Sequence, residues 1–208
     1  MTSGFRHQRP LQAVRKPLWC CAAFLLALRV FAVDGSSATN CEFSGVARIS
    51  FKGTSTLHDF EGHVSAQPVT LNLLSNSWSA VADVLSGAMT TANESRDRNM
   101  WKMLGTNLFP RIRGVVRDAP VPETGTSTGR ATMSLSIRDR QRDIPVTLSN
   151  WSESEGVLRF EANWLLSLRQ YNLSPPSVMG VVRVGDKVQL HAEVLATNVL
   201  SPLLTRAR

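Results

Sequence analysis

Histidine and aspartate side chains that could bind a metal or catalyse hydrolysis gather once in this sequence, at His58, Asp59 and His63. A zinc site needs three or four converging ligands, commonly with a further His or Cys at a characteristic spacing, and none follows these three. If the segment is a strand, His58 and Asp59 point to opposite faces and cannot both reach one ion. We therefore interpret the segment as a polar loop and expect no metal site. A hydrolase that uses His58 and Asp59 stays open as a third alternative.

Motifs for other enzyme chemistries are missing from the sequence. No Gly-x-Ser-x-Gly segment offers a serine nucleophile, and no glycine-rich segment is suited to cradling a phosphate group. Cys41 is the one cysteine after residue 32, and a single thiol cannot form an internal disulfide. We interpret it as a small residue at the start of a strand. We therefore expect no catalytic residues and no cofactor.

Arg96 and Asp97 lie in the first turn of the only helix that the pattern indicates, with Met100 and Met103 one and two turns further on. Two interpretations remain open. In one, Arg96 holds the polar head of a ligand at the mouth of a barrel, and the two methionines form an adaptable apolar lid. In the other, which we favour, Arg96 and Asp97 form a hydrogen-bonded clamp that docks the helix across the barrel end.

Three stretches of the sequence alternate apolar and polar side chains with a period of two, and they indicate the scaffold that positions the residues named above. Their apolar members are Ala131, Met133, Leu135 and Ile137, then Leu158, Phe160, Ala162, Trp164 and Leu166, then Val188, Leu190, Ala192 and Val194. Because successive side chains of a strand point to opposite faces, each stretch has one apolar and one solvated face. Strands of this kind, without long crossover helices, predict an antiparallel sheet that closes around its apolar face.

The rest of the chain predicts further strands and one short helix within a single all-β domain. Asn93 can cap the helix and Gly105 can end it. We expect further strands at residues 41–51, 54–64, 69–74, 78–86, 109–116, 144–149 and 181–184. Turns or loops are expected at 75–77, 120–128, 138–143, 150–156, 171–176 and 185–186, and a loose tail at 197–208. About eight or nine strands result.

The first 32 residues carry an export pattern. Basic residues precede an apolar run at 18–28, as they do in a signal peptide, and the run is too short for a comfortable membrane span. Small residues at 30–32 and 36–38 suit a signal peptidase. We predict a signal peptide at 1–32, with cleavage after Ala32 or near Ala38.

Most of the net charge belongs to this leader. It holds five basic residues and no acidic one, which leaves about +2 of the formal +7 to the rest of the chain. The basic residues are Arg6, Arg9, Arg15, Lys16 and Arg29. No stripe of basic and aromatic residues appears elsewhere, so we expect no nucleic acid partner.

Several ordered segments resemble the YceI-like family of exported bacterial proteins. Residues 55–62 resemble the family's early Ser-x-x-His-x-Phe-x-Gly segment, and residues 91–97, followed by Met100 and Phe109-Pro110, resemble its Arg-Asp helix and the next strand. Residues 135–138 with 144–148 resemble its paired strands, and residues 184–188 its last hairpin. The charged turn at 138–143 departs from the family, which more often has a glycine there.

The resemblance implies a single antiparallel, eight-stranded, lipocalin-like barrel at residues 41–196 that binds a polyisoprenoid in the periplasm or outside the cell. An isoprenoid quinone or a polyprenol would then be a ligand rather than a cofactor. Our candidate ligand-binding residues are Phe109, Met133, Leu135, Phe160, Trp164, Leu190, Ala192, Met100, Met103 and Arg96. We expect no stable membrane insertion, and a homodimer stays open.

A barrel with a filled core is the alternative, and it would suit a non-catalytic interaction or stress-response protein. Each buried methylene of a ligand contributes about 0.8 kcal/mol, so a tunnel needs only apolar walls and leaves faint sequence signals. Large-to-small substitutions of the inward side chains distinguish a filled core from a ligand-binding tunnel. Emptying a packed core costs roughly 2–5 kcal/mol, whereas enlarging an occupied tunnel changes the preferred ligand length at less cost.

Overall fold

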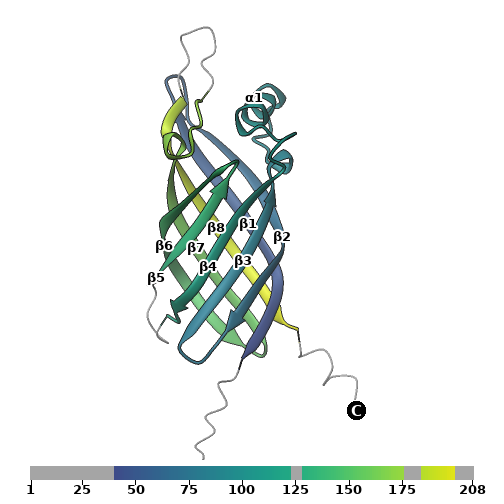
Figure 1. Cartoon of the computed structure of the whole chain (residues 1–208), viewed down its shortest axis with the longest axis vertical. Helices are drawn as coiled ribbons and strands as arrows, with labels where there is room; N and C mark the ends of the chain where they lie inside the picture. Colours follow the sequence, from purple (N-terminus) through teal and green to yellow (C-terminus); the bar gives the residue numbers. More distant parts are fainter. Residues whose placement is uncertain (1–39, 123–127, 176–183, 200–208) are drawn as a thin grey trace, which may run out of the picture. The chain divides into compact units, whose positions relative to one another are not determined.

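The computed structural model of this chain describes residues 40–122, 128–175 and 184–199, and they form one closed barrel. Every strand pairs antiparallel with its neighbours in sequence, and β1 pairs with β8 to close the sheet (Figure 1). The strands are β1 Cys41–Ser55, β2 Phe60–Leu73, β3 Ser77–Leu85, β4 Arg111–Pro120, β5 Thr128–Ile137, β6 Arg140–Ser154, β7 Val157–Ser167 and β8 Val184–Asn198. The expected eight-stranded antiparallel barrel with one short helix is confirmed.

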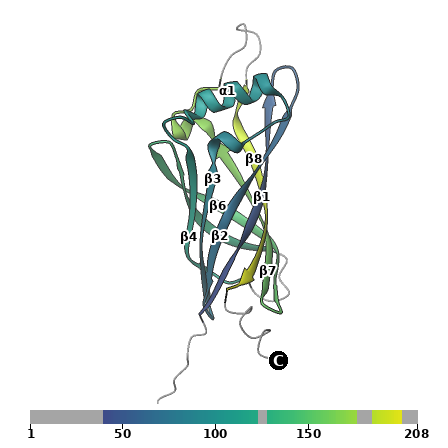
Figure 2. The same ribbon diagram turned by 90° about the vertical axis from the view of Figure 1, so that its right-hand side faces the viewer.

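The helix, α1 (Glu94–Leu104), lies across one end of the barrel, between β3 and β4 in the chain (Figure 2). Its start is fixed by Asn93, whose side chain accepts a hydrogen bond from the backbone N–H of Arg96. Its end is fixed by Gly105, which adopts the left-handed conformation that glycine tolerates best. Both caps are as predicted. Two short 3₁₀ helices, η1 (Ser86–Ala88) and η2 (Leu168–Tyr171), lie at the same end (Figure 1).

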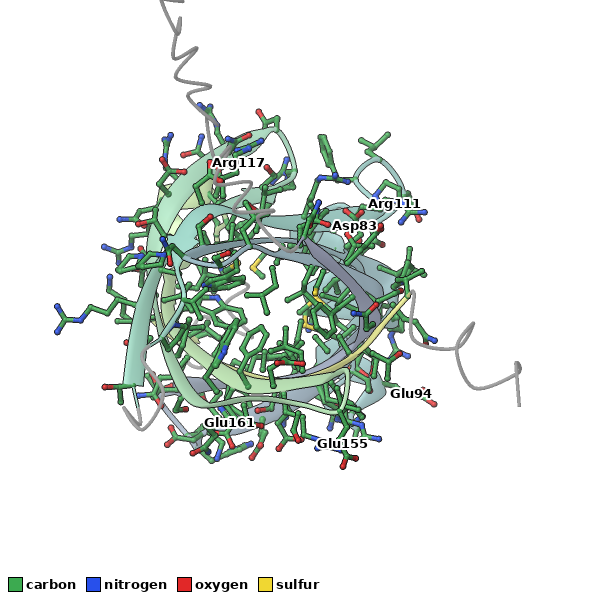
Figure 3. All side chains as sticks on the ribbon, turned by 90° about the horizontal axis from the view of Figure 1, so that it is seen from below. Asp83, Glu94, Arg111, Arg117, Glu155 and Glu161 are labelled. Carbon is green, nitrogen blue, oxygen red and sulfur yellow. The ribbon has the colours of Figure 1, made fainter. Side chains whose placement is uncertain are left out.

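The predicted alternation decides which side chains face inward. In β8 the buried residues are Val188, Ala192, Val194 and Ala196, and the intervening side chains are largely exposed. Viewed along the axis, charged side chains such as those of Arg117 and Glu161 project outward from the wall (Figure 3). The apolar faces of all eight strands therefore share one interior.

Two strands are longer than the sequence indicates. The expected strand at 54–64 begins in the end of β1 and the β1–β2 loop, and its residues from Phe60 onward join those at 69–73 in one strand, β2. This strand accommodates Pro68 where its register with β3 shifts between Ala66 and Val69. β6 likewise takes in most of the two expected turns at 138–143 and 150–156. Asn150 adopts a positive φ of 54° where the register with β7 shifts, so its turn-like character marks a bulge within the strand.

The tight turn expected at Gly185 and Asp186 is also wrong, because both residues belong to β8. A Cβ atom on Gly185 would lie 2.5 Å from the hydroxyl oxygen of Thr54 in β1. Glycine is required here by the close approach of two strands and not by a turn.

Other expectations fall outside the described residues and stay predictions. These are the signal peptide and its cleavage sites, the centre of the loop at 120–128, most of the strand at 181–184, and the tail beyond residue 199. β8 itself continues to Asn198, two residues beyond the expected end of the barrel domain. Among the described residues, no helix has the length and apolar character needed to span a membrane.

Candidate functional site

The barrel interior contains a cavity of about 530 Å³ that all eight strands line. This volume lies within the range of pockets that bind small molecules. Its wall is almost entirely aliphatic, aromatic and methionine side chains, and the polar lining residues gather at the end covered by α1. An elongated apolar ligand is the kind of molecule that such a wall can bury.

One end of the cavity is closed by an aromatic cluster that we call the floor, made by Trp78, Trp151 and Phe160. The ring centroids of Trp151 and Phe160 lie 4.9 Å apart, and that of Trp78 lies 5.3 Å and 5.6 Å from them. Trp78 and Phe160 line the cavity. Beside the floor, Phe43 is 1% exposed and does not line the cavity, so the barrel is hollow toward α1 and packed toward the other end.

The opposite end, which we call the mouth, lies between α1 and the loop that joins β1 to β2. Leu57 and His58 of that loop line the cavity, as do Arg96 and Asn99 of the helix. Leu57 is 65% exposed, so this lining residue reaches solvent. Met100 and Met103 of α1 also line the cavity, and their flexible side chains cover it where the barrel wall ends.

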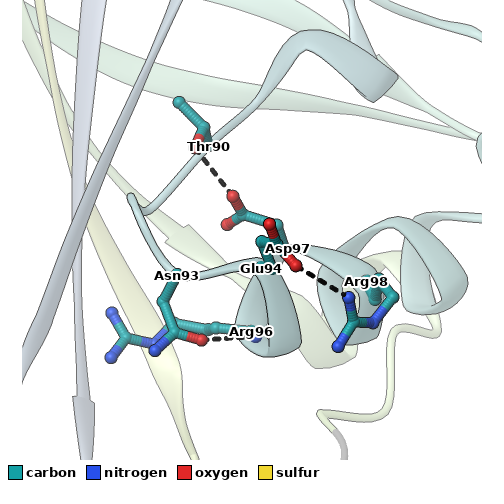
Figure 4. A network of polar contacts seen from close by, with 6 residues as sticks. All are labelled: Thr90, Asn93, Glu94, Arg96, Asp97 and Arg98. Atoms are coloured by element: carbon teal, nitrogen blue, oxygen red, sulfur yellow. Dashed lines mark hydrogen bonds and ion pairs between the residues drawn. The ribbon is translucent and has the colours of Figure 1, made fainter.

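α1 is held in place by the buried carboxylate of Asp97. The hydroxyl group of Thr90 donates to it over 2.7 Å (Figure 4). The hydroxyl group of Thr91 donates over 2.6 Å and the backbone N–H of Thr91 over 2.7 Å. Burial raises the pKa of Asp97, but these hydrogen bonds and the nearby charge of Arg96 outweigh it and hold the pKa below the usual 3.8. Thr90 in turn exchanges two backbone hydrogen bonds with His63 of β2. The clamp was expected from Arg96 and Asp97 together, but Asp97 makes these contacts alone, while Arg96 lines the cavity.

Replacing Asp97 with Asn is expected to destabilise the barrel by about 1.5–3 kcal/mol, the usual worth of hydrogen bonds to a charged group. Because its pKa is lowered in the folded state, Asp97 stabilises above pH 3.8 and loses this effect as the pH falls through the lowered value. Urea unfolding at pH 7 and below pH 3 should therefore show a difference between the two proteins that shrinks in acid. Glu94→Gln, at an exposed acid of the same helix, should shift stability by less than about 0.5 kcal/mol.

A second carboxylate, that of Asp186, ties η2 to β8 at the same end of the barrel. The Ser167 hydroxyl donates to Asp186 over 2.6 Å and the backbone N–H of Arg169 donates over 2.8 Å. The Ser167 hydrogen bond is the main reason that the pKa of Asp186 is lowered. Next to it, burial raises the pKa of Tyr171 to about 12. Two fixed carboxylates thus hold α1 and η2 at this end of the barrel, and neither of them lines the cavity.

Two solved structures share this architecture. BcnA from Burkholderia cenocepacia superposes with a TM-score of 0.59 at 12% sequence identity, covering 73% of this chain and 96% of its own. A polyisoprenoid-binding domain from Saccharophagus degradans, implicated in plant cell wall breakdown, gives 0.57 at 10%, covering 77% and 99%. The chain has their fold.

A Campylobacter jejuni YceI protein aligns more weakly, with a TM-score of 0.48 at 15% identity over 58% of this chain and 72% of its own. We draw no conclusion from that weaker likeness. Compared by sequence alone, the chain matches no protein-family model and no curated protein.

The shared fold brings nine of the ten candidate ligand-binding residues to one cavity. Six come from the wall and three from α1, namely Met133, Leu135, Phe160, Trp164, Leu190 and Ala192 with Arg96, Met100 and Met103. Phe109 is the exception among them. It precedes β4, and its ring lies 5.4 Å from the guanidinium carbon of Arg138, away from the cavity lining.

The sequence reasoning missed the β3 and β4 side of the cavity. Trp78, Ala80 and Ala82 of β3 line it, as do Ile112 and Gly114 of β4. Alternation over 78–84 could have identified the β3 residues, because Ser79, Val81 and Asp83 separate the inward positions. Small residues such as Ala82 and Gly114 carry no apolar bulk to mark them, and Met133 of β5 packs over Gly114, where a Cβ atom would lie 2.9 Å from its sulfur.

Proposed function

We propose that this protein is an exported, YceI-like lipid-binding barrel that holds a polyisoprenoid or a similar long apolar chain. The observation that carries the proposal is the cavity of about 530 Å³ with a largely apolar wall and a closed floor, whose Ser, Thr, Asn, His and Arg lining residues gather near its mouth. The shared fold supports it, since one of the two solved structures is a polyisoprenoid-binding domain.

The energetics favour a chain ligand without specific polar contacts. Ten buried methylene groups contribute about 8 kcal/mol, which corresponds to micromolar affinity before the costs of association. Because each further methylene group adds about 0.8 kcal/mol, a longer isoprenoid chain can offset these costs through contacts with apolar side chains. An isoprenoid quinone or a polyprenol would be held as cargo.

We propose binding without catalysis. His58 is the one imidazole on the cavity wall, and the neighbouring Ser55 donates its hydroxyl to the His58 carbonyl over 2.6 Å and not to the ring. This serine is therefore not arranged as a nucleophile activated by histidine. Within the described residues, no three His, Cys, Asp or Glu side chains are grouped to hold a metal ion.

We place the protein in the periplasm or outside the cell. The proposal rests on the basic and apolar pattern of the first 32 residues. In that setting a barrel that covers a long apolar chain would let the lipid cross water. Amino-terminal sequencing of the exported protein should begin at Val33 or near Ala38–Asn40, and an intact leader would contradict export.

Native mass spectrometry of protein purified from its exported compartment should show one lipid per barrel. Organic extraction followed by mass spectrometry should then identify an isoprenoid chain. Delipidated protein should take up an added polyprenol and regain the mass. An empty protein that also takes up no polyprenol, quinone or other long-chain lipid would favour the interaction or stress-response alternative.

A further inference from the structure

The cavity has a single permanently charged group among its described lining residues, the guanidinium of Arg96. Around it at the mouth lie the polar lining side chains Ser95 and Asn99 of α1 and His58 of the β1–β2 loop. The deeper wall is apolar. A ligand whose tail fills the barrel must therefore place its head group beside Arg96, so this residue can distinguish one head group from another.

Arg96 has no carboxylate within 4 Å among the described residues, although acidic groups lie close to it in sequence. Asp97 directs its oxygens to Thr90 and Thr91, and Glu94 pairs with Arg98 at 3.3 Å. Figure 4 shows the Arg96 side chain extending away from Asp97, on the side of Asn93. Its guanidinium carbon lies 5.4 Å from the centre of the Phe60 ring, which positions the group at the mouth without neutralising it.

The position of Arg96 in the helix also favours a negatively charged group at the mouth. It lies in the first turn of α1, where the helix dipole disfavours a cation and favours an anion. The positive charge of the guanidinium and the positive end of the helix dipole therefore both attract a negatively charged head group at the mouth. The fixed charge of Asp97 offsets part of this field, but its oxygens are already occupied by hydrogen bonds.

We propose that the mouth selects lipids with an anionic head group, and that Arg96 is the specificity-determining residue. The guanidinium offers a planar fork of donors that matches a phosphate or a carboxylate. The ligand class is thus a long chain ending in a phosphate or carboxylate, such as a prenyl phosphate. Neutral quinones and alcohols still bind through their apolar chains, but more weakly than an anionic lipid of the same length. This inference rests on the proposed lipid-binding function and narrows it.

The test compares ligands of one length in the delipidated protein. Geranylgeranyl phosphate should bind at least tenfold more tightly than geranylgeraniol by isothermal titration, and the preference should weaken as salt is raised. Oleate against oleyl alcohol shows whether a carboxylate is also preferred. A preference for either anion supports the proposal and identifies the head group. Equal affinity for each anion and its alcohol would overturn it while leaving lipid binding intact.

Arg96→Gln should bring the phosphate and the alcohol within about twofold of each other without weakening the alcohol, and Arg96→Lys should restore part of the preference. Retained alcohol binding shows that the variants fold. Arg98→Gln, at an exposed arginine on the same helix, is the matched control and should keep the wild-type preference. A preference that survives in Arg96→Gln overturns the role of this residue. If none of the four ligands binds the wild-type protein, the lipid-binding function itself fails.

Discussion

Replacing Phe160 with Ala is expected to let the barrel hold longer chains and to destabilise the lipid-free protein by up to about 3 kcal/mol, less than the same truncation costs in a filled core. Phe160 is 6% exposed and stacks on Trp151 at 4.9 Å, so truncation to Ala leaves a void that its aromatic neighbours cannot refill. It also lines the cavity, so the void extends the cavity past the floor. Denaturant unfolding measures the loss of stability. Binding of farnesol, geranylgeraniol and a longer polyprenol measures the change in length preference.

Phe43→Ala is the matched control for this prediction. Phe43 is 1% exposed and belongs to the same apolar cluster, but it does not line the cavity. The same chemical truncation should therefore cost more, about 3–5 kcal/mol of unfolding free energy, without favouring longer chains. Equal length preferences in Phe160→Ala and the wild type would show that the aromatic cluster does not limit the ligand.

The Trp78 ring shows why bulk matters at this position. Its indole N–H is buried, and no acceptor for it exists among the described residues. An unpaired buried donor costs about 1–3 kcal/mol, so packing must outweigh that penalty for a tryptophan to be stable here. The floor is therefore built from ring volume and not from polar contacts.

The barrel strands could be predicted where one face meets water and the other meets the core. In β7, Leu158, Phe160 and Ala162 face inward and alternate with polar or charged residues, so period two specifies both the strand and its inner face. The capped helix was predictable for a similar reason, because Asn93 and Gly105 satisfy backbone groups at its two ends.

Strand lengths were predicted poorly where backbone pairing with a neighbouring strand, and not burial of side chains, keeps the residues in the sheet. Arg140–Asp143 at the start of β6 are all exposed, so no apolar face marks them, yet they pair with residues 134–137 of β5. Pro68 and Asn150 look like turn residues because they lie at register shifts within long strands. The local sequence indicates an irregular backbone at these residues. It does not show that the neighbouring strand keeps pairing on both sides of them.

The cavity itself could not be separated from a packed core by sequence. Phe43 and Phe160 are both inward-facing aromatic residues in alternating strands, but only Phe160 touches the cavity. The difference depends on the height of each residue along the barrel axis and on which inward side chains of the other strands lie at the same height. That height is set by the pairing register of all eight strands together. Arg96 and Asp97 likewise share a helical turn, and only the structure separates the clamping carboxylate from the unpaired cation.

A larger side chain on the β3 wall of the cavity should abolish lipid binding at little cost in stability. Ala82 of β3 lines the cavity opposite its strand partner Gly114, and both positions lack the bulk found elsewhere on the wall. A phenylalanine at position 82 would occupy cavity space that we propose a lipid chain fills. If it displaces four methylene groups, the loss is about 3 kcal/mol, or more than a hundredfold in affinity.

Stability distinguishes this outcome from ordinary overpacking. Extra bulk in a filled core costs about 1–3 kcal/mol, whereas a ring that enters open space should cost less than about 1 kcal/mol. Val81→Phe, one residue earlier on the same strand and outside the cavity lining, is the matched control and should keep its lipid. Native mass spectrometry and urea unfolding of both variants measure the two effects together. An Ala82→Phe protein that retains full lipid occupancy would mean that the bound chain lies outside this cavity.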